Sequence, residues 1–122
     1  MDKRVIYYED SKGIKPAKEF INKLDANLRA KILARLTFLG KHWFELRRPF
    51  IDYLGDKLYE LRIMLSSDNV RIIYAYMFHD HIVLLHGIVK KTQKVPENDK
   101  LTAKKRMIDF QIRYDEGRIK LR

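Results

Sequence analysis

The sequence predicts an α+β fold: one antiparallel sheet of about four strands, with two N-terminal helices and one C-terminal helix attached to it. Three short apolar runs, rich in Val, Ile and Tyr, lie in the middle of the chain at residues 57–63, 70–76 and 82–91, and polar turns separate them. Runs of this length and composition are typical of consecutive antiparallel strands. Helical patterns lie on both sides of these runs, which is the arrangement expected of an α+β domain.

The N-terminal part predicts a first strand followed by the two helices. Residues 4–8 form an apolar run, and a polar turn follows at residues 10–13. Pro16 suits the first turn of a helix, where a missing N–H group costs nothing. Asp25 is expected to cap the second helix, because a carboxylate accepts hydrogen bonds from the free amides of a first turn. Gly40 is expected to end that helix as its C′ residue.

The rest of the chain predicts a connection, the three strands and a last helix. Residues 42–56 are rich in aromatic residues and are expected to form an ordered connection packed by them. The last helix is expected to open at residues 96–99, where acidic groups suit the helix dipole. It has two apolar stripes, one of which contains Leu101, Ile108 and Ile112, so we expect it to pack on the sheet by a wide face.

The composition favours one domain across residues 1–122, with a charged tail at 115–122 that is expected to fray. The net charge of +10 favours an acidic partner: nucleic acid, an anionic membrane surface or an acidic protein. The chain contains no cysteine, which excludes disulfides and thiolate chemistry. Neither a secretory signal nor an apolar run long enough to span a bilayer is evident, so we expect a soluble, cytoplasmic protein.

Cations near the ends of the three central strands predict a positive site on the sheet. Because strand side chains alternate between faces, Glu60 and Arg62 lie side by side. An unpaired buried arginine is costly, so Arg71 is expected either to pair with Glu60 or to face a ligand at the open end of the sheet. Arg62 and Arg71 therefore fit a structural ion pair with Glu60, and Lys90 and Lys91 fit a solvated loop. Together, the four cations also fit a phosphate site.

Further basic residues have the same two interpretations. Lys57 and Lys94 flank the central strands, and the last helix carries a triplet of Lys104, Lys105 and Arg106. A solvated helical face and a nucleic-acid contact both explain such a triplet.

The histidines are weaker candidates for functional residues than the cations. His79 and His81 lie two residues apart without a third ligand at a recognisable spacing, so the sequence predicts no metal site. His86 lies in an apolar strand and is expected to be a hydrogen-bonded core residue, although its ordinary pKa also suits acid–base chemistry. No motif for a phosphate loop, a dinucleotide or a hydrolase nucleophile is present, and we expect no cofactor.

Residues 57–62, 71–74 and 84–96 resemble the phage-derived branch of the RelE/HigB toxins, as does Ala103 followed by a basic helix. The resemblance extends from about Tyr7 to about Tyr114. It implies a curved antiparallel sheet and the toxin half of a bacterial toxin–antitoxin pair. Such toxins generally cut mRNA on the ribosome, and a small antitoxin, often with a helix-turn-helix, silences them.

The resemblance also implies roles for individual residues. The family's phosphate-binding arginine matches Arg71, and its basic pair after the fourth strand matches Lys90 and Lys91. Lys57 or Arg62 stands for the basic residues of the second strand, and Tyr114 is the nearest counterpart of a C-terminal tyrosine.

RNA cleavage through the 2′-OH requires a base, phosphate-binding cations and an acid. The expected catalytic set contains five residues: Arg71, Lys90, Lys91, Arg62 and Glu60. The expected RNA contacts are Lys57, Lys94, Lys104, Lys105 and Arg106. The alternatives are a basic module that binds RNA or DNA without cutting it, and an inactive toxin relative.

Overall fold

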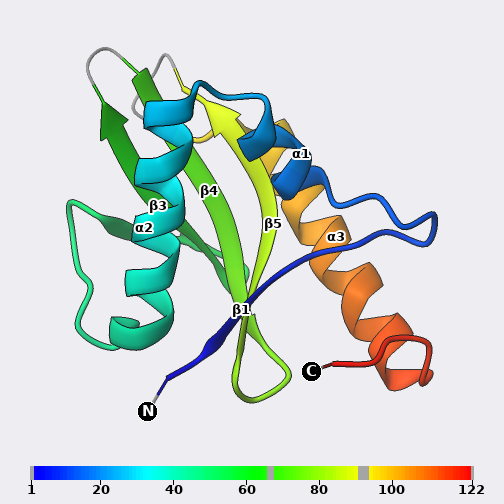
Figure 1. Ribbon diagram of the computed structural model, residues 1–122. Coiled ribbons are helices and arrows are strands. Elements are labelled where there is room, and N and C mark those ends of the chain that lie inside the picture. Colours follow the sequence, from blue (N-terminus) through cyan, green and yellow to red (C-terminus); the bar gives the residue numbers. More distant parts are fainter. Residues whose placement is uncertain (1, 66–67, 91–93, 122) are drawn as a thin grey trace.

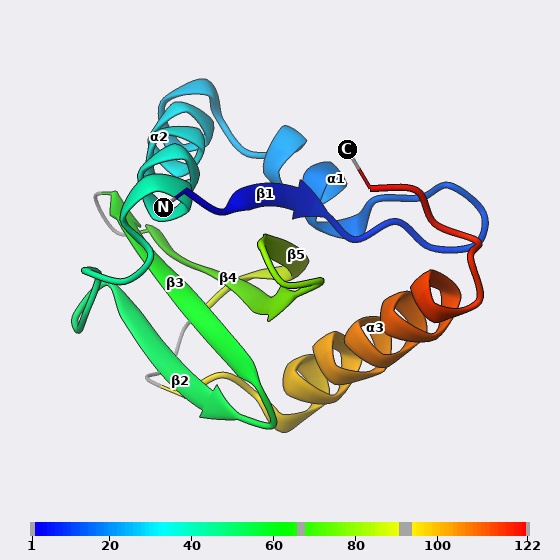
Figure 2. The same ribbon diagram turned by 90° about the horizontal axis from the view of Figure 1, so that it is seen from below.

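The computed structural model describes residues 2–65, 68–90 and 94–121, and in these ranges a five-stranded sheet lies between two helices and a third helix (Figures 1 and 2). The strand order is β1-β5-β4-β3-β2. The strands are β1 (Arg4–Tyr7), β2 (Ile51–Gly55), β3 (Leu58–Leu65), β4 (Asp68–Met77) and β5 (His81–Val89). The helices are α1 (Pro16–Asn22), α2 (Ala26–His42) and α3 (Glu97–Asp115).

Each face of the sheet has its own hydrophobic core because side chains alternate along the strands. On one face, α1 and α2 pack on a core that includes Leu61, Ile72 and Leu84. On the other face, α3 packs on a core that includes Ile73 and Leu85. The central strands β4 and β5 are covered on both faces, and most of their side chains are buried.

The predicted α+β class is confirmed, but the expected strand number and the purely antiparallel pairing are wrong for the described chain. The fifth strand, β2, lies within residues 42–56, which were expected to form a connection. It pairs antiparallel with β3 through only a few residues and shifts register before Gly55. At the opposite edge, β1 pairs parallel to β5, with Arg4 beside His81. The sheet is therefore mixed.

The ends of α2 show one confirmed expectation and one wrong one. Asp25 caps the helix, since its Oδ1 accepts a hydrogen bond from the Leu28 amide at 3.0 Å. Gly40 does not end the helix, which continues to His42. A Cβ at Gly40 would lie 2.9 Å from the Lys3 carbonyl oxygen, and the Lys3 amide donates to the Gly40 carbonyl at 2.8 Å. Gly40 therefore lets the N-terminal segment approach the helix backbone.

A second glycine allows close packing between α1 and β5. A Cβ built on Gly87 would lie 2.2 Å from the ring of Phe20, far closer than two carbon atoms can approach. The Phe20 ring therefore occupies the space that a side chain at position 87 would need.

The expected wide packing face of α3 is only partly present. Ala103 and Phe110 are buried against the sheet, whereas Leu101, Ile108 and Ile112 are 49%, 47% and 48% exposed. The second apolar stripe thus points away from the sheet, and the expectation that it packs there is wrong. None of the helices in the described residues has the length and apolar character needed to cross a membrane.

Candidate functional site

A buried carboxylate lies between two arginines on the face of the sheet that α3 covers. Arg62 on β3 is directly opposite Arg71 on β4 in the register. Two like charges at such a position repel each other, and Glu60 compensates for both. Its Oε1 accepts a hydrogen bond from Arg62 Nε at 2.7 Å and lies 3.4 Å from Arg71 Nε.

A second carboxylate extends this group to the edge strand. Asp52 on β2 is the register partner of Glu60, and its Oδ2 accepts from Arg62 Nη2 at 2.9 Å. Its Oδ1 accepts from Arg48 Nη2, also at 2.9 Å. Although partial burial opposes it, the hydrogen bonds and charge of Arg48 hold the pKa of Asp52 below its usual value. We call Asp52, Glu60, Arg62 and Arg71 the carboxylate–arginine cluster.

The cluster is buried at Glu60 and Arg71 and partly exposed at Asp52 and Arg62. The side chains of Glu60 and Arg71 are 2% and 4% exposed, whereas that of Arg62 is 26% exposed. Lys90, at the end of β5, is also buried. Burial, and then the positive charge of Arg71, lowers the pKa of Lys90. Burial likewise lowers the pKa of Arg71, and Glu60 opposes this effect.

The cluster opens to solvent through a small pocket of about 230 Å³, which we call the cluster pocket. Its lining combines cluster residues with side chains that precede or begin α3. It is lined by Asp52, Tyr53, Leu54, Glu60, Arg62, Lys94, Val95, Glu97 and Lys100. In the described part of the chain, Glu60 Oε2 and Arg71 Nε are buried without a hydrogen-bond partner. Glu60 lines the cluster pocket, and a carboxylate oxygen without a hydrogen-bond partner is chemically able to accept a proton.

The structure brings together four of the five expected catalytic residues. Glu60, Arg62, Arg71 and Lys90 are neighbours, and Arg71 pairs with Glu60, which was one of the two arrangements that the sequence left open. The fifth residue, Lys91, lies outside the described residues.

The expected RNA contacts lie at separate places. Lys94 lines the cluster pocket. Lys57 is exposed in the β2–β3 turn, where its φ is 68°, and its amide donates to the Tyr53 hydroxyl at 3.2 Å. Lys104 reaches Asp56, with 3.7 Å between Nζ and Oδ1, and Lys105 is exposed.

Arg106, the last of the expected RNA contacts, is half-buried and contacts β5. Its Nη1 donates to the Leu85 carbonyl at 2.8 Å and lies 2.9 Å from Nδ1 of His86. This guanidinium therefore points towards β5, and burial lowers its pKa. His86 is, as expected, hydrogen-bonded and largely buried, since its Nε2 also lies 2.7 Å from Asp99 Oδ1.

Another candidate, Tyr114, lies away from the cluster. The Tyr114 ring contacts that of Phe78, beyond the end of β4, with 4.3 Å between the ring centroids, whereas Arg71 lies near the start of that strand. Six strand residues correspond to roughly 20 Å, so Tyr114 does not reach the cluster.

Over the described ranges, no group of three His, Cys, Asp or Glu side chains is arranged to hold a metal ion.

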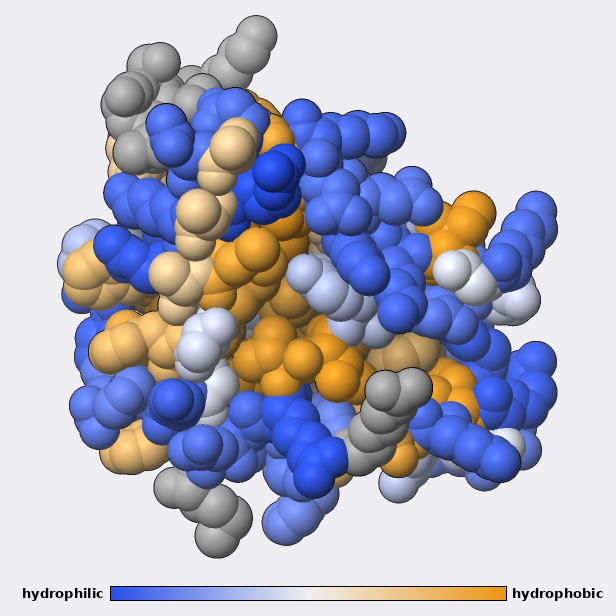
Figure 3. All heavy atoms as spheres, viewed as in Figure 1, coloured by the Kyte–Doolittle hydropathy of each residue, from blue (hydrophilic) through white to orange (hydrophobic). Residues whose placement is uncertain are grey.

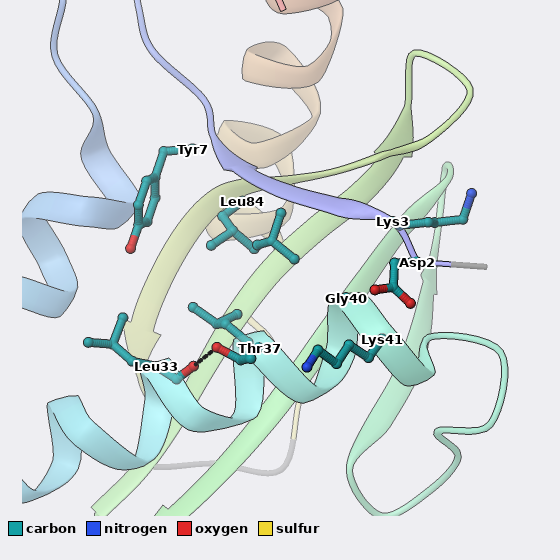
Figure 4. Close-up of a pocket in the computed structure, with 10 residues that line it drawn as sticks. Asp2, Lys3, Tyr7, Leu33, Thr37, Gly40, Lys41 and Leu84 are labelled. Carbon is teal, nitrogen blue, oxygen red and sulfur yellow. Dashed lines mark hydrogen bonds between the residues drawn. The ribbon is translucent and has the colours of Figure 1, made fainter. Parts of the chain in front are cut away.

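A groove between β1 and α2 has a different character. Its volume is about 380 Å³, and its walls include Leu33, Leu84 and Tyr7. Apolar side chains gather in this hollow (Figure 3), and the charged side chains of Asp2 and Lys41 lie at one end of it (Figure 4). The groove offers apolar contact area, not a set of acid and base groups.

Sequence reasoning missed Asp52, Tyr53 and Lys100, which all line the cluster pocket. Asp52 and Tyr53 were missed because β2 was not recognised as a strand. The alternation of Ile51 and Tyr53 around Asp52, just after Pro49, was the available signal.

Comparison with known proteins identifies the family of the chain. Phage-derived Gp49-like proteins (DUF891), a toxin-like family, match residues 19–108. This range extends from α1 into α3 and contains every residue of the carboxylate–arginine cluster. No curated protein matches the chain at a significant level. Because the match covers well over half of its 122 residues, the chain belongs to the phage-derived Gp49-like family.

Proposed function

We propose that this protein is the toxin of a toxin–antitoxin pair and that it is an endoribonuclease that cleaves mRNA, as RelE/HigB-like toxins do. Membership of a toxin-like family supports the first part of the proposal. The net charge of +10 supports an RNA substrate, because a basic protein gains affinity by releasing the counterions of the phosphates.

The observation that carries the proposal is the state of Glu60. One carboxylate oxygen is held by Arg62, and the other is buried without a hydrogen-bond partner in the part of the chain that the structure describes. The same carboxylate lines a pocket beside a half-buried arginine and an exposed lysine, Lys94. A base, a phosphate-binding cation and an acid thus share one opening.

The reaction assigns one role to each of these groups. Glu60 Oε2 takes the proton of the ribose 2′-OH, and the 2′-oxygen then attacks phosphorus. The Arg62 guanidinium binds the phosphate oxygens as negative charge builds on them. The bond from phosphorus to the 5′-oxygen breaks, and Lys94 donates a proton to that oxygen. The products are a 2′,3′-cyclic phosphate and a 5′-hydroxyl end.

The two buried cations act as positioning residues. Arg71 lies against Glu60, and Lys90 is close enough for its pKa to respond to Arg71 and Glu60. Their positive charges balance the charge of the buried carboxylate and fix its position. We propose that the ribosome holds the RNA for this reaction, since alignment of a substrate can lower a barrier by roughly 7 kcal/mol or more.

The burial of the cluster also favours a second candidate, a basic module that binds RNA without cutting it. Arg71 and Lys90 are 3% and 5% exposed, which suits ions that stabilise the sheet. Both candidates bind RNA with a steep salt dependence, so salt titration does not separate them. The proposed protein partner of the toxin is an antitoxin encoded by an adjacent gene, and such a gene would favour the toxin over the basic module.

The deciding experiment maps new mRNA 5′ ends after translating ribosomes are incubated with the protein. The wild type is expected to create 5′-hydroxyl ends. Arg62→Gln is expected to reduce them at least tenfold, because it removes the guanidinium that binds the phosphate, and circular dichroism of the variant checks that it folds. Arg71→Ala and Lys91→Ala should relieve growth arrest in bacteria that express the chain.

The matched control is Arg118→Gln, which removes the same charge from an exposed pair with Glu116. It is expected to leave cleavage unchanged. Wild-type protein that produces no new ends, or an Arg62→Gln variant that cuts as fast as the wild type, would overturn the ribonuclease assignment.

A further inference from the structure

A second pocket lies beside the cluster pocket and has no part in the proposed reaction. Its volume is about 440 Å³, within the usual range for ligand sites. It is lined mainly by aromatic rings and arginines: Trp43, Phe44, Leu46, Arg47, Arg48, Ile51, Asp52, Tyr53, Tyr59 and Tyr76. We call it the aromatic pocket.

Two rings of the aromatic pocket present open faces. Tyr53 and Phe44 are 55% and 46% exposed, a large exposure for aromatic side chains. The Tyr53 ring is held in place, since it lies 4.9 Å from the Tyr59 ring and its hydroxyl accepts from the Lys57 amide. Trp43 is held between its neighbours, with Lys3 Nζ 4.4 Å from its ring centroid. Rigid, open rings of this kind are platforms for stacking.

The cations of the aromatic pocket are suited to phosphate. Arg47 donates to the Phe44 carbonyl at 2.8 Å, which fixes it on the loop. The side chain of Arg48 is 77% exposed. Aromatic faces next to arginine forks are the combination by which proteins bind unpaired nucleotides, because the ring stacks on the base and the guanidinium binds the backbone.

Asp52 joins the aromatic pocket to the cluster pocket. It lines both pockets, as does Tyr53, and its two oxygens accept from Arg48 and Arg62 at 2.9 Å each. β2 is an edge strand, so a ligand can pass around it from one face of the sheet to the other. A phosphate on Arg62 therefore lies next to an arginine that belongs to the aromatic pocket.

We propose that the aromatic pocket binds an unpaired base of single-stranded nucleic acid, next to the phosphate held by Arg62. The inference deepens the proposed function. It rests on that function for the phosphate that Arg62 binds. Tyr53 supplies the stacking face, and Arg48 exchanges its contact with Asp52 for the backbone of the ligand.

The test uses the fluorescence of Trp43, the single tryptophan of the chain, which lines the aromatic pocket. The probe is a single-stranded oligodeoxynucleotide of about six residues, within the range that one single-strand binding site covers. It has no 2′-OH and cannot be cut by the proposed reaction. Its control is the same strand with abasic sites, which keeps the phosphates and removes the bases.

The base-containing strand is expected to quench Trp43 and to bind at least tenfold more tightly than the abasic strand, because stacking contributes about that much per base. Tyr53→Ala should weaken binding of the base-containing strand about tenfold and leave the abasic strand unaffected. Tyr53→Phe keeps the ring and should bind as the wild type does. Tyr114→Ala removes another exposed tyrosine, at a distance from the aromatic pocket, and should also bind normally.

Equal affinities for the two strands, or a Tyr53→Ala variant that binds both as the wild type does, would overturn the base site. This failure differs from failure of the proposed function. Quenching by the base-containing strand without new mRNA ends on ribosomes would support the aromatic pocket and overturn the ribonuclease. New mRNA ends without any effect of Tyr53→Ala on binding would overturn the pocket alone.

Discussion

Arg71 and Glu60 form an ion pair in the interior of the sheet, with 3.4 Å between Nε and Oε1 and side chains that are 4% and 2% exposed. The two residues lie on neighbouring strands, so the pair depends on the register of β3 against β4. Because water cannot replace either partner at such a depth, the loss of one leaves the other as a buried, uncompensated charge.

Glu60→Gln is therefore expected to destabilise the fold. The substitution keeps the shape of the side chain but leaves Arg62, Arg71 and Lys90 without their shared carboxylate. We expect the free energy of unfolding to fall by about 3 kcal/mol, as in other buried pairs that lose one partner. Urea denaturation followed by circular dichroism measures this change.

Glu97→Gln provides the control for Glu60→Gln, since the side chain of Glu97 is 89% exposed. It should change the free energy of unfolding by less than about 0.5 kcal/mol. A Glu60→Gln protein as stable as the Glu97→Gln protein would show that the buried carboxylate does not hold the cluster together.

Lys90 is expected to make stability depend on pH in the alkaline range. Burial and the nearby arginines lower its pKa below the usual 10.5. Between the lowered pKa and 10.5, the unfolded chain binds more protons than the folded chain, so stability rises with pH across this window. Lys90→Met removes the titrating group and should remove this part of the rise.

The measurement for Lys90 is the difference in unfolding free energy between wild type and Lys90→Met at about pH 7 and about pH 9. The comparison stays below pH 10 because burial raises the pKa of Tyr74 and Tyr76, whose ionisation lowers stability at higher pH. Parallel stability curves for the two proteins would contradict the prediction.

Two neighbouring cations on α3, Lys105 and Arg106, are expected to contribute differently to the stability of the fold. Arg106 donates to the Leu85 carbonyl, whereas Lys105 is exposed. Arg106→Ala should lower the free energy of unfolding by about 1–3 kcal/mol, because it leaves a half-buried acceptor without its donor. Lys105→Ala should change it by less than about 0.5 kcal/mol. Thermal and urea unfolding of the two variants give the comparison, and equal stabilities would contradict it.

Asp109 is expected to support stability down to acidic pH. Its Oδ2 accepts from Tyr8 Oη at 2.7 Å and from Arg113 Nη2 at 2.8 Å. The hydrogen bond from Arg113 lowers the pKa of Asp109, although partial burial opposes this. The contribution of Asp109 is therefore present at neutral pH and is lost as pH falls below about 4 towards the lowered pKa.

Asp109→Asn should consequently reduce stability at neutral pH and flatten its decline in acid. Unfolding in urea at about pH 7 and about pH 3 tests both effects. Asp2→Asn, at an exposed position, is the control and should follow the wild type. An Asp109→Asn protein that loses stability in acid as steeply as the wild type would contradict the assignment.

Local periodicity was sufficient to predict part of the cluster from the sequence. The alternation of side chains along residues 58–63 placed Glu60 and Arg62 on one face. It also left two outcomes open for Arg71, since only the pairing of β3 with β4 decides which side chains meet. The direction of β1 was beyond reach for a similar reason, because its partner β5 is distant in the sequence. The strand β2 was within reach, because it forms a hairpin with the neighbouring β3 and its side chains alternate around Asp52.

The expectations for α3 took too little account of helical spacing. Arg106 lies three residues after Ala103 and four before Phe110, so helical spacing places it beside the buried stripe. Its charge suggested the surface instead. Leu101, Ile108 and Ile112 were assigned to the sheet because they are apolar, although a single helix cannot bury two well-separated stripes on one flat partner.

The absence of a side chain at Gly87 links two positions that lie far apart in the sequence. Since the ring of Phe20 fills the place of the missing Cβ, a larger residue at 87 is tolerated only after the residue at 20 has become smaller. Homologues should therefore change at these two positions together, as a small–large pair or its reverse. A laboratory selection that starts from Gly87→Ala should recover folding through replacement of Phe20.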